Sequence, residues 1–280
     1  MPGPAFELTH DEDRWQRARD ALRLECAHAR CTRFVAPHLG RNAIPYHRLF
    51  LVPSASARGS RVVDERARRE WSLAPGTALL LPARRLYRFD FAAGLLLVGF
   101  HFRLAGPGGI DVLDGALGVA HATGHADDAD RAAEAVALRT PAAWLTAEGV
   151  LRLHLGRGLA ASWSEIERAT AAARRWQPAI ARLEAAPPGG ADIARLASAV
   201  GISRQHFTRR FRADFGCTPR AWHQRQLARR VVDRLLADDA PLDEVADGFG
   251  FSDAFAFSRF VLRATGMRPS RWRQLGPSPA

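Results

Sequence analysis

The chain has 280 residues, of which 47% are hydrophobic and 25% charged, a composition typical of globular proteins and a length sufficient for two domains. Its longest apolar stretch, Ala92–Phe100, is far shorter than the ~20 residues of a membrane-spanning helix, and the chain begins with no secretory signal pattern. Three cysteines are too few for a disulfide framework. We therefore expect a soluble cytoplasmic protein that has no membrane partner.

The charge is unevenly distributed. All 40 basic residues are arginines, and with 29 acidic residues they give a net charge of +11. Residues 187–280 carry 15 arginines and 9 acidic residues, so a net +6 falls in the last third of the chain. A basic segment of this kind favours a polyanionic partner.

The first predicted element is a helix over residues 9–30. Thr9 and Glu12 have the spacing of a capping box, and Trp15, Leu22 and Cys26 recur near one face.

From Thr32 to Leu104 the pattern changes to short apolar runs between prolines and glycines, which predicts antiparallel strands in a sandwich or small barrel. These runs are Leu49–Val52, Ala78–Leu81 and Leu95–Phe102. A loop is expected over residues 105–125.

Three alanine-rich helices are predicted next, over Asp127–Arg139, Ala142–Gly156 and Ser164–Leu183. Pro187-Pro188-Gly189-Gly190 then forms the clearest boundary in the chain.

An internal repeat follows this boundary. Ala197 and Ala246 are 49 positions apart, and so are Gly201 and Gly250. The pairs Gly216/Gly266, Pro219/Pro269 and Trp222/Trp272 are each 50 positions apart.

Each copy has the pattern of a helix-turn-helix motif. An alanine lets two helices approach closely, and a glycine supplies the positive φ of the sharp turn. Ser203 or Ser252 is expected to cap the second helix, which ends at Gly216 or Gly266. Two copies with matched spacing make this prediction strong.

The repeat resembles the AraC/XylS family of transcriptional regulators. The second copy carries the family's signature stretch, from Gly250-Phe251-Ser252-Asp253 through Phe257-Ser258-Arg259 to Gly266-Met267-Arg268-Pro269 and Trp272-Arg273. The resemblance covers about residues 176–274 and implies a tandem helix-turn-helix domain that binds operator or promoter DNA. One departure is that Val261 and Leu262 stand where the family usually has an aromatic and then a basic residue.

The helical period separates a core face from a DNA-facing face in each motif. Phe207, Phe211 and Phe215 cluster on one side of the helix that begins at Ser203, and polar residues lie opposite. Arg209 can bind guanine and Gln205 adenine in the major groove. The candidate DNA-binding residues are Ser203, Arg204, Gln205, Thr208, Arg209, Arg212, Ser252, Phe255, Ser258, Arg259 and Arg263.

One long helix over Pro219–Leu236 is predicted between the motifs. In the family that the repeat resembles, this helix holds the two DNA-binding helices in successive major grooves. Its arginines either contact phosphate or only solubilise the surface, and the sequence leaves both alternatives open.

The strand-rich region looks like the cupin-like sensing barrel of many such regulators. The segments that carry this likeness are Pro45-Tyr46-His47, Leu73-Ala74-Pro75-Gly76, Leu81-Pro82 and Phe100-His101-Phe102. The candidate effector-binding residues are His47, Arg84, Arg85, Tyr87 and His101. A basic pocket with aromatic edges would suit a carboxylate or a sugar acid.

No catalytic constellation, metal site or cofactor is predicted. Cys26, His28 and Cys31 could form a metal or redox site, but buried cysteines are the more common reason for such a group. His121 and His125 have helical i, i+4 spacing, yet Ala122 stands where a metalloprotease would need glutamate.

We therefore predict an α+β regulator in three parts. Residues 1–125 form a cupin-like effector-sensing domain, 126–186 a helical linker that is a candidate dimerisation region, and 187–280 the tandem helix-turn-helix domain. Its expected partners are double-stranded DNA, a small-molecule effector, RNA polymerase and a second copy of the chain.

Two other functions stay open at this point: a metal-dependent cupin enzyme fused to a DNA-binding module, and an architectural protein that binds DNA without sequence preference. Metal analysis distinguishes the first, and competition by unrelated DNA distinguishes the second.

Overall fold

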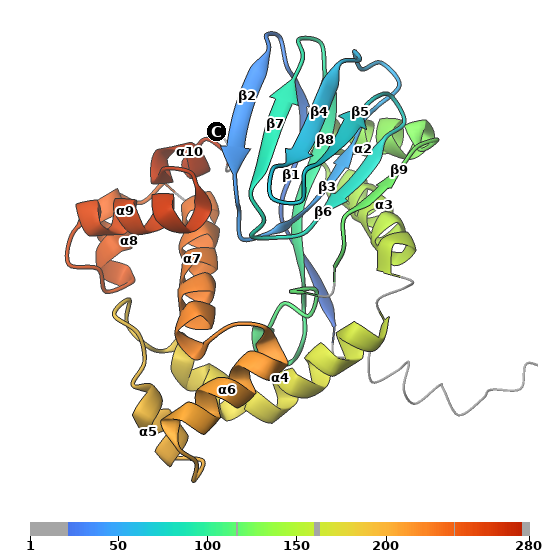
Figure 1. Ribbon diagram of the computed structural model, residues 1–280. Helices are drawn as coiled ribbons and strands as arrows, with labels where there is room; N and C mark the ends of the chain where they lie inside the picture. The colour runs from blue at the N-terminus through green and yellow to red at the C-terminus, as the bar shows by residue number, and fades with distance from the viewer. Residues whose placement is uncertain (1–21, 116, 160–162, 238, 276–280) are drawn as a thin grey trace, which may run out of the picture.

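The computed structural model describes residues 22–115, 117–159, 163–237 and 239–275. Figure 1 shows a β-rich domain with two helices on one side and a helical C-terminal region on the other. The mixed architecture confirms the α+β prediction.

Two antiparallel sheets make up the N-terminal domain. The five-stranded sheet has the order β1 (Arg23–Arg33), β8 (Leu96–Ala105), β3 (His47–Leu51), β6 (Ala78–Leu81) and β9 (Ala120–Ala122). The four-stranded sheet has the order β2 (His38–Asn42), β7 (Tyr87–Phe91), β4 (Ser60–Asp64) and β5 (Arg69–Leu73).

The central strands β3 and β6 of the five-stranded sheet are buried on both faces. Leu49 and Leu51 of β3 pack toward the helices, whereas Phe50 packs into the core between the two sheets. Successive side chains of a strand point to opposite faces, so burial on both sides requires the continuous apolar runs of the sequence.

One predicted element is wrong over the residues that can be compared. Residues 23–30 belong to the long strand β1, which pairs with β8, and not to a helix. Leu22 and Cys26 pack against the core below the sheet, so the apolar recurrence reflects one face of a strand. Thr9, Glu12 and Trp15 lie outside the described residues.

The three predicted helices after the strands are confirmed within a few residues. They are α2 (Ala126–Leu138), α3 (Pro141–Leu159) and α4 (Trp163–Glu184), and a short 3-10 turn, η1 (Pro107–Gly109), precedes them. Helices α2 and α3 pack together and cover the outer face of the five-stranded sheet.

The tandem motif is also confirmed. Its helices are α5 (Ile193–Ser198), α6 (Arg204–Phe215), the connecting helix α7 (Pro219–Ala237), α8 (Leu242–Gly248), α9 (Ala254–Thr265) and α10 (Pro269–Arg273). Helices α5 and α6 lie at one end of α7, and α8 to α10 lie at the other (Figure 1).

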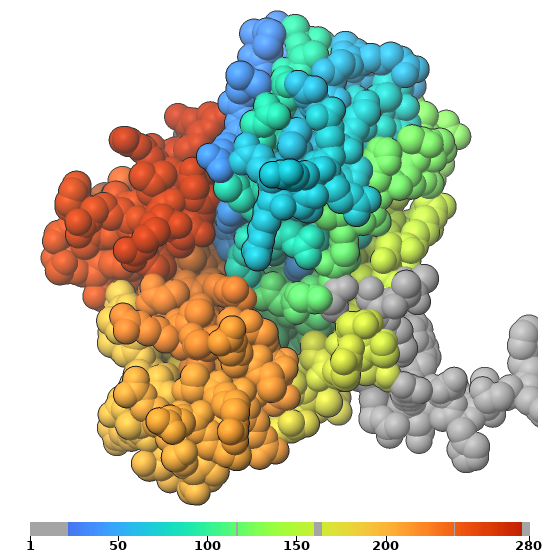
Figure 2. Space-filling view, viewed as in Figure 1, coloured from blue at the N-terminus to red at the C-terminus, as the bar shows by residue number. Residues whose placement is uncertain are grey.

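The β-domain is docked directly onto the second motif. Ile44 and Tyr46 belong to the same hydrophobic cluster as the buried face of α7, and the amide of Ala43 donates to the carbonyl of Thr265 at 3.3 Å. Figure 2 shows the C-terminal helices in contact with the first strands. In the described part of the chain, no helix is both long and apolar enough to cross a bilayer.

Candidate nucleic-acid interface and small-molecule pocket

The first motif is fixed at its helix ends by side-chain caps. Asp192 accepts hydrogen bonds from the amides of Ala194 and Arg195 at the start of α5. Ser203 caps α6 as predicted, because its hydroxyl accepts from the amide of His206 at 3.2 Å. Gly201 turns the chain between the helices with a φ of +71°.

The two faces of α6 are sharply different. Phe207 and Phe211 are fully buried, and their rings lie 5.0 and 5.1 Å from that of Trp176 on α4. The opposite face lines a shallow groove of about 800 Å³ whose walls carry Ser203, Arg204, Gln205, Thr208, Arg209, Arg212 and Thr218. All six residues that the sequence singled out on α6 and at its cap are thus gathered on one surface.

The second motif repeats this design with one correction. Asp253, not Ser252, caps α9, because the Asp253 carboxylate accepts from the amide of Ala256 at 2.6 Å, while the Ser252 hydroxyl donates to the same carboxylate. The hydrogen bond from the Ala256 amide lowers the pKa of the Asp253 carboxyl. Aspartate competes well with serine at this position because its charge also favours the helix N-terminus.

The exposed face of α9 carries fewer polar groups than that of α6. The Arg259 guanidinium lies over the ring of Phe255, 4.7 Å from its centroid, and Phe255 is 70% exposed. Arg263 is exposed and Ser258 is half-buried, whereas Phe257 and Val261 face the core.

The five residues predicted to bind an effector do not surround one cavity. His47 is buried on the helix side of the sheet, where its Nδ1 accepts from the amide of Ala83 and its Nε2 donates to Asp111, both at 3.0 Å. Arg84 forms an ion pair with Asp114, and Arg85 is exposed. Tyr87 is buried between the sheets, and His101 is the one of the five that lines the pocket between the two domains described below.

This pocket, of about 730 Å³, lies between the β-domain and the C-terminal helices. Its β-domain wall includes His28, Phe50, Phe89 and His101, and its opposite wall is formed by residues of α9, α10 and their connections, including Leu262, Gly266, Met267, Arg271 and Leu275. The volume is in the range of small-molecule sites.

Arg48 is the functional candidate that the sequence analysis missed. It lines the pocket and is only 1% exposed. Its Nη1 donates to Asn42 at 2.8 Å, but its Nε and Nη2 have no hydrogen-bond partner among the described residues. In the sequence, Arg48 stands directly before the apolar run of a predicted strand. This position of an arginine is the feature that could have indicated a buried functional residue.

The surroundings of Arg48 are aromatic, and no carboxylate of the described residues pairs with it. Its guanidinium lies 5.1 Å from the ring centroids of both Tyr87 and Phe89, and burial lowers its pKa to about 10. Buried charges are normally paired, so Arg48 is a candidate to bind an external anion.

A chain of aromatic contacts leads from the pocket to α7. The rings of His28 and His101 are 5.3 Å apart, and His101 stacks on Tyr46 with a centroid distance of 6.3 Å. The Tyr46 hydroxyl donates to Asp233 on α7. Burial lowers the pKa of His28 to about 4 and that of His101 well below its usual value, so both rings are neutral at pH 7.

Comparison with known proteins places this geometry in a family. Residues 196–275 match a family model described as a helix-turn-helix domain. The regulatory protein Ada of Salmonella typhimurium is 34% identical over 84 residues, which are 30% of this chain and 24% of that protein. A protein of Streptomyces antibioticus described as an AraC-like transcription regulator is 31% identical over 134 residues, 45% of this chain and 41% of that protein. Residues 196–275 are an AraC-type helix-turn-helix domain.

These curated relatives share less than half of their own length with the chain. The whole chain is nevertheless similar in fold to a solved structure: ToxT of Vibrio cholerae O395 aligns with a TM-score of 0.55 over 93% of this chain and 100% of that one. At 10% identity this likeness concerns the fold alone.

The departure from the family pattern has a structural counterpart in the AraC-type domain. Val261 fills the core of the second motif, and Phe260 beside it is also buried. Leu262 is partly exposed and forms part of the pocket wall. An apolar residue therefore replaces the expected basic residue where the helix borders a pocket.

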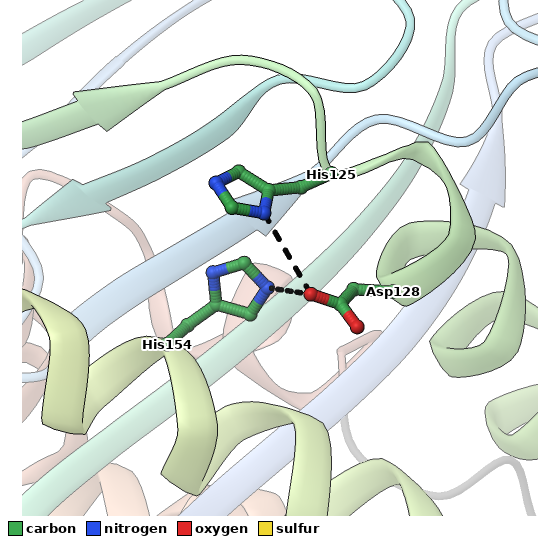
Figure 3. A group of neighbouring side chains, drawn as sticks. All are labelled: His125, Asp128 and His154. Carbon is green, nitrogen blue, oxygen red and sulfur yellow. Dashed lines mark ion pairs between the residues drawn. The ribbon is translucent and has the colours of Figure 1, made fainter.

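A second polar cluster lies on the other side of the β-domain, where the start of α2 meets α3 (Figure 3). His154 Nε2 and His125 Nδ1 lie 3.2 and 3.7 Å from the same oxygen of Asp128. Arg157 contacts that oxygen at 3.1 Å. Burial opposes ionisation of Asp128, yet its contacts with Arg157 and the histidines leave the pKa of this carboxyl below its usual value.

Proposed function

We propose that the protein is a transcription regulator that binds specific DNA through both helix-turn-helix motifs and responds to a small molecule. The observation that carries this function is the pair of capped helices, α6 and α9, held at opposite ends of α7 with basic residues on their exposed faces. Such an arrangement suits two successive major grooves of one DNA face, which are ~34–36 Å apart.

The two motifs are proposed to contribute unequally to specificity. The α6 groove offers Gln205 and Arg209 to base edges, with Arg204, Arg212 and the hydroxyls of Ser203 and Thr208 at its borders. On α9 the stacked pair of Arg259 and Phe255 can contact a guanine and a neighbouring thymine methyl group. We propose that Ser252, Ser258 and Arg263 contact the phosphate backbone of the DNA.

The pocket is proposed to hold an effector with an acidic group. Arg48 supplies an unpaired guanidinium, which binds carboxylates in a two-pronged geometry. The aromatic and aliphatic walls would cover an apolar body. A carboxylic acid in the related fold supports this class, since one ToxT structure holds an unsaturated fatty acid.

The effector would act because the two sides of its pocket belong to different domains. A ligand that binds better in one arrangement of the β-domain and α9 than in another shifts the equilibrium toward that arrangement. We propose activation of a promoter in the cytoplasm, with RNA polymerase and a second copy of the chain as further partners.

The DNA function is tested by incubating the full-length protein with fragmented genomic DNA and sequencing the retained fragments. We expect a shared motif with two half-sites about one helical turn apart. Fragments without a common motif, displaced equally by any competitor DNA, would contradict sequence-specific binding.

The effector is tested separately by thermal melting with a panel of small carboxylic acids and their matched amides. We expect the acids to raise the melting temperature and the amides to have no effect, because only a carboxylate neutralises Arg48. Equal stabilisation by acids and amides would reject the acidic class.

A further inference from the structure

The residues His125, Asp128 and His154 line neither the α6 groove nor the pocket that is proposed to bind the effector. The geometry points to a site for a divalent transition-metal ion that prefers imidazole and carboxylate ligands, such as Zn²⁺ or Co²⁺. The sequence analysis predicted no metal here, because His154 is remote in sequence and joins the other two residues only when α3 packs against α2.

The ligand atoms have the spacing that such an ion requires. One nitrogen of each histidine and one oxygen of Asp128 all lie within 4.8 Å of one another. Bonds of 2.0–2.2 Å in a tetrahedral zinc site put neighbouring ligand atoms about 3.3–3.5 Å apart. The two contacts to the Asp128 oxygen, 3.2 and 3.7 Å, bracket that separation.

His154 supplies a second, independent observation. Its side chain is only 5% exposed and its Nε2 lies 3.2 Å from the carboxylate. This nitrogen is nevertheless without a hydrogen bond of acceptable geometry among the described residues. A buried nitrogen close to an anion but not directed at it is satisfied by an ion bound between the two groups.

The position of each ligand suits a three-residue site that keeps one coordination position open. His125 is the N-cap residue of α2, but its side chain makes no capping bond and its Nδ1 faces Asp128 instead. The side chains of His125 and Asp128 are 21% and 18% exposed, so water can occupy the fourth position. Two imidazoles favour zinc, cobalt, nickel or iron over magnesium and calcium.

Arg157 would compete with this ion for Asp128 and His125. Its Nη1 lies 3.1 Å from the Asp128 oxygen and 3.5 Å from His125 Nδ1, so a cationic nitrogen already occupies the region toward which two ligands point. The Arg157 side chain is 50% exposed and can turn into solvent without loss of core packing. Its charge would weaken metal binding but leave the ligands in place.

A bound ion would fasten the start of α2 to α3. Because α2 also packs against β1, β3 and β8, the ion would stiffen the helical cover of the five-stranded sheet. The effect proposed for the ion is this link between α2 and α3, and no chemical step is assigned to the metal.

The test is a cobalt titration of the full-length protein after treatment with a chelator, followed by visible absorption. We expect one equivalent of Co²⁺ with the bands of a nitrogen and oxygen site, displaced by Zn²⁺. His125→Ala and Asp128→Asn should each weaken binding by more than about a hundredfold, since even the loss of a residue that only hydrogen-bonds to a metal ligand costs about 10–100-fold. His121→Ala, an exposed histidine outside the cluster, is the matched control and should bind normally.

The competing role of Arg157 gives a variant that gains function. Arg157→Ala should bind Co²⁺ about tenfold more tightly, because a neighbouring positive charge is removed. A misfolded variant would lose Co²⁺ binding, so tighter binding by Arg157→Ala cannot result from misfolding. The site is refuted if Co²⁺ does not bind, if binding survives Asp128→Asn, or if a thiolate charge-transfer band assigns the ion to Cys26 or Cys31.

Discussion

At the scale of single residues, Arg48 has an unusual environment, because it is a buried cation whose Nε and Nη2 make no hydrogen bond with the described residues. Arg48→Met keeps the aliphatic stem and removes the charge. We expect the ligand-free variant to melt at the same or a higher temperature, since replacing an unpaired buried charge by an apolar group removes a desolvation penalty. The variant should also lose all stabilisation by carboxylic acids.

Arg41→Met is the control for this substitution. Arg41 lines the same pocket, but it is 60% exposed and pairs with Glu65. It should retain the response to acids. A large drop in the melting temperature of Arg48→Met alone would mean that the guanidinium is structural.

Arg209 is expected to determine base preference in one half of the operator. Its guanidinium lies on the exposed face of α6, 3.3 Å from His206. Arg209→Ala should weaken specific binding by ~1–3 kcal/mol and relax the preferred motif, whereas Arg212→Ala should weaken all sequences equally and lower the salt slope by ~1. Binding selections on randomised DNA measure both effects. A motif that changes with Phe255→Ala but not with Arg209→Ala would reverse the assignment.

The two pocket histidines make stability depend on pH. Both His28 and His101 have lowered pKa values in the folded protein. Between about pH 6.5 and pH 4 their imidazoles are therefore protonated in the unfolded chain and neutral in the folded protein. Stability should therefore fall as pH decreases from 7 to 5, by up to about 1.4 kcal/mol per pH unit for each histidine. Urea unfolding of His101→Gln should show a flatter pH dependence than wild type, and an unchanged pH dependence would contradict this role of His101.

At the scale of elements, the first motif depends on a helix outside the tandem repeat. Trp176 of α4 packs against Phe207 and Phe211, so α4 supplies part of the core beneath α6. Phe207→Ala should lower the free energy of unfolding by ~3–5 kcal/mol, because it opens a cavity in a fully buried cluster. Denaturant unfolding measures the loss, and an unchanged value would contradict the placement of this face in the core.

The sequence predicted elements well where a periodic pattern was long or repeated, and less well where one face was ambiguous. The helices after residue 126 and both motifs were predicted closely, since capping residues and repeated glycines define their ends. Residues 23–30 were assigned to a helix and not to a strand because Leu22 and Cys26 satisfy both a helical and a strand pattern. Only the pairing of β1 with β8 decides between them.

The candidate sites show the same division. The exposed face of α6 could be predicted because it lies within one helix, where spacing determines direction. The pocket could not, because its walls come from strands and helices more than 150 positions apart in sequence, such as Arg48 and Leu262. His47 and Arg84 were plausible effector-binding residues because of their residue types. Each is already paired with a carboxylate, Asp111 or Asp114, and the sequence does not reveal this pairing.

At the scale of the whole molecule, the contacts of α4 suggest an earlier start for the DNA-binding unit than residue 187. We propose that the unit begins near residue 163, because α4 residues Ala173, Trp176 and Ile180 belong to the core of the first motif. A fragment of residues 163–280 should unfold cooperatively and bind DNA, whereas residues 187–280 should be much less stable. Circular dichroism melts of the two fragments compare them directly, and equal stability would support the boundary at 187.

Leu262 and Gly266 belong to the helix and turn of the second motif and at the same time to the wall of the pocket. A small molecule in the pocket would therefore contact α9 directly. Binding of the small molecule and binding of DNA would then be two coupled equilibria. Coupling of this kind is reciprocal: if a ligand changes the affinity for DNA by some factor, DNA changes the affinity for the ligand by the same factor. A short operator duplex should thus alter the dissociation constant of the small molecule, so that operator DNA would act as an allosteric effector of the small-molecule site.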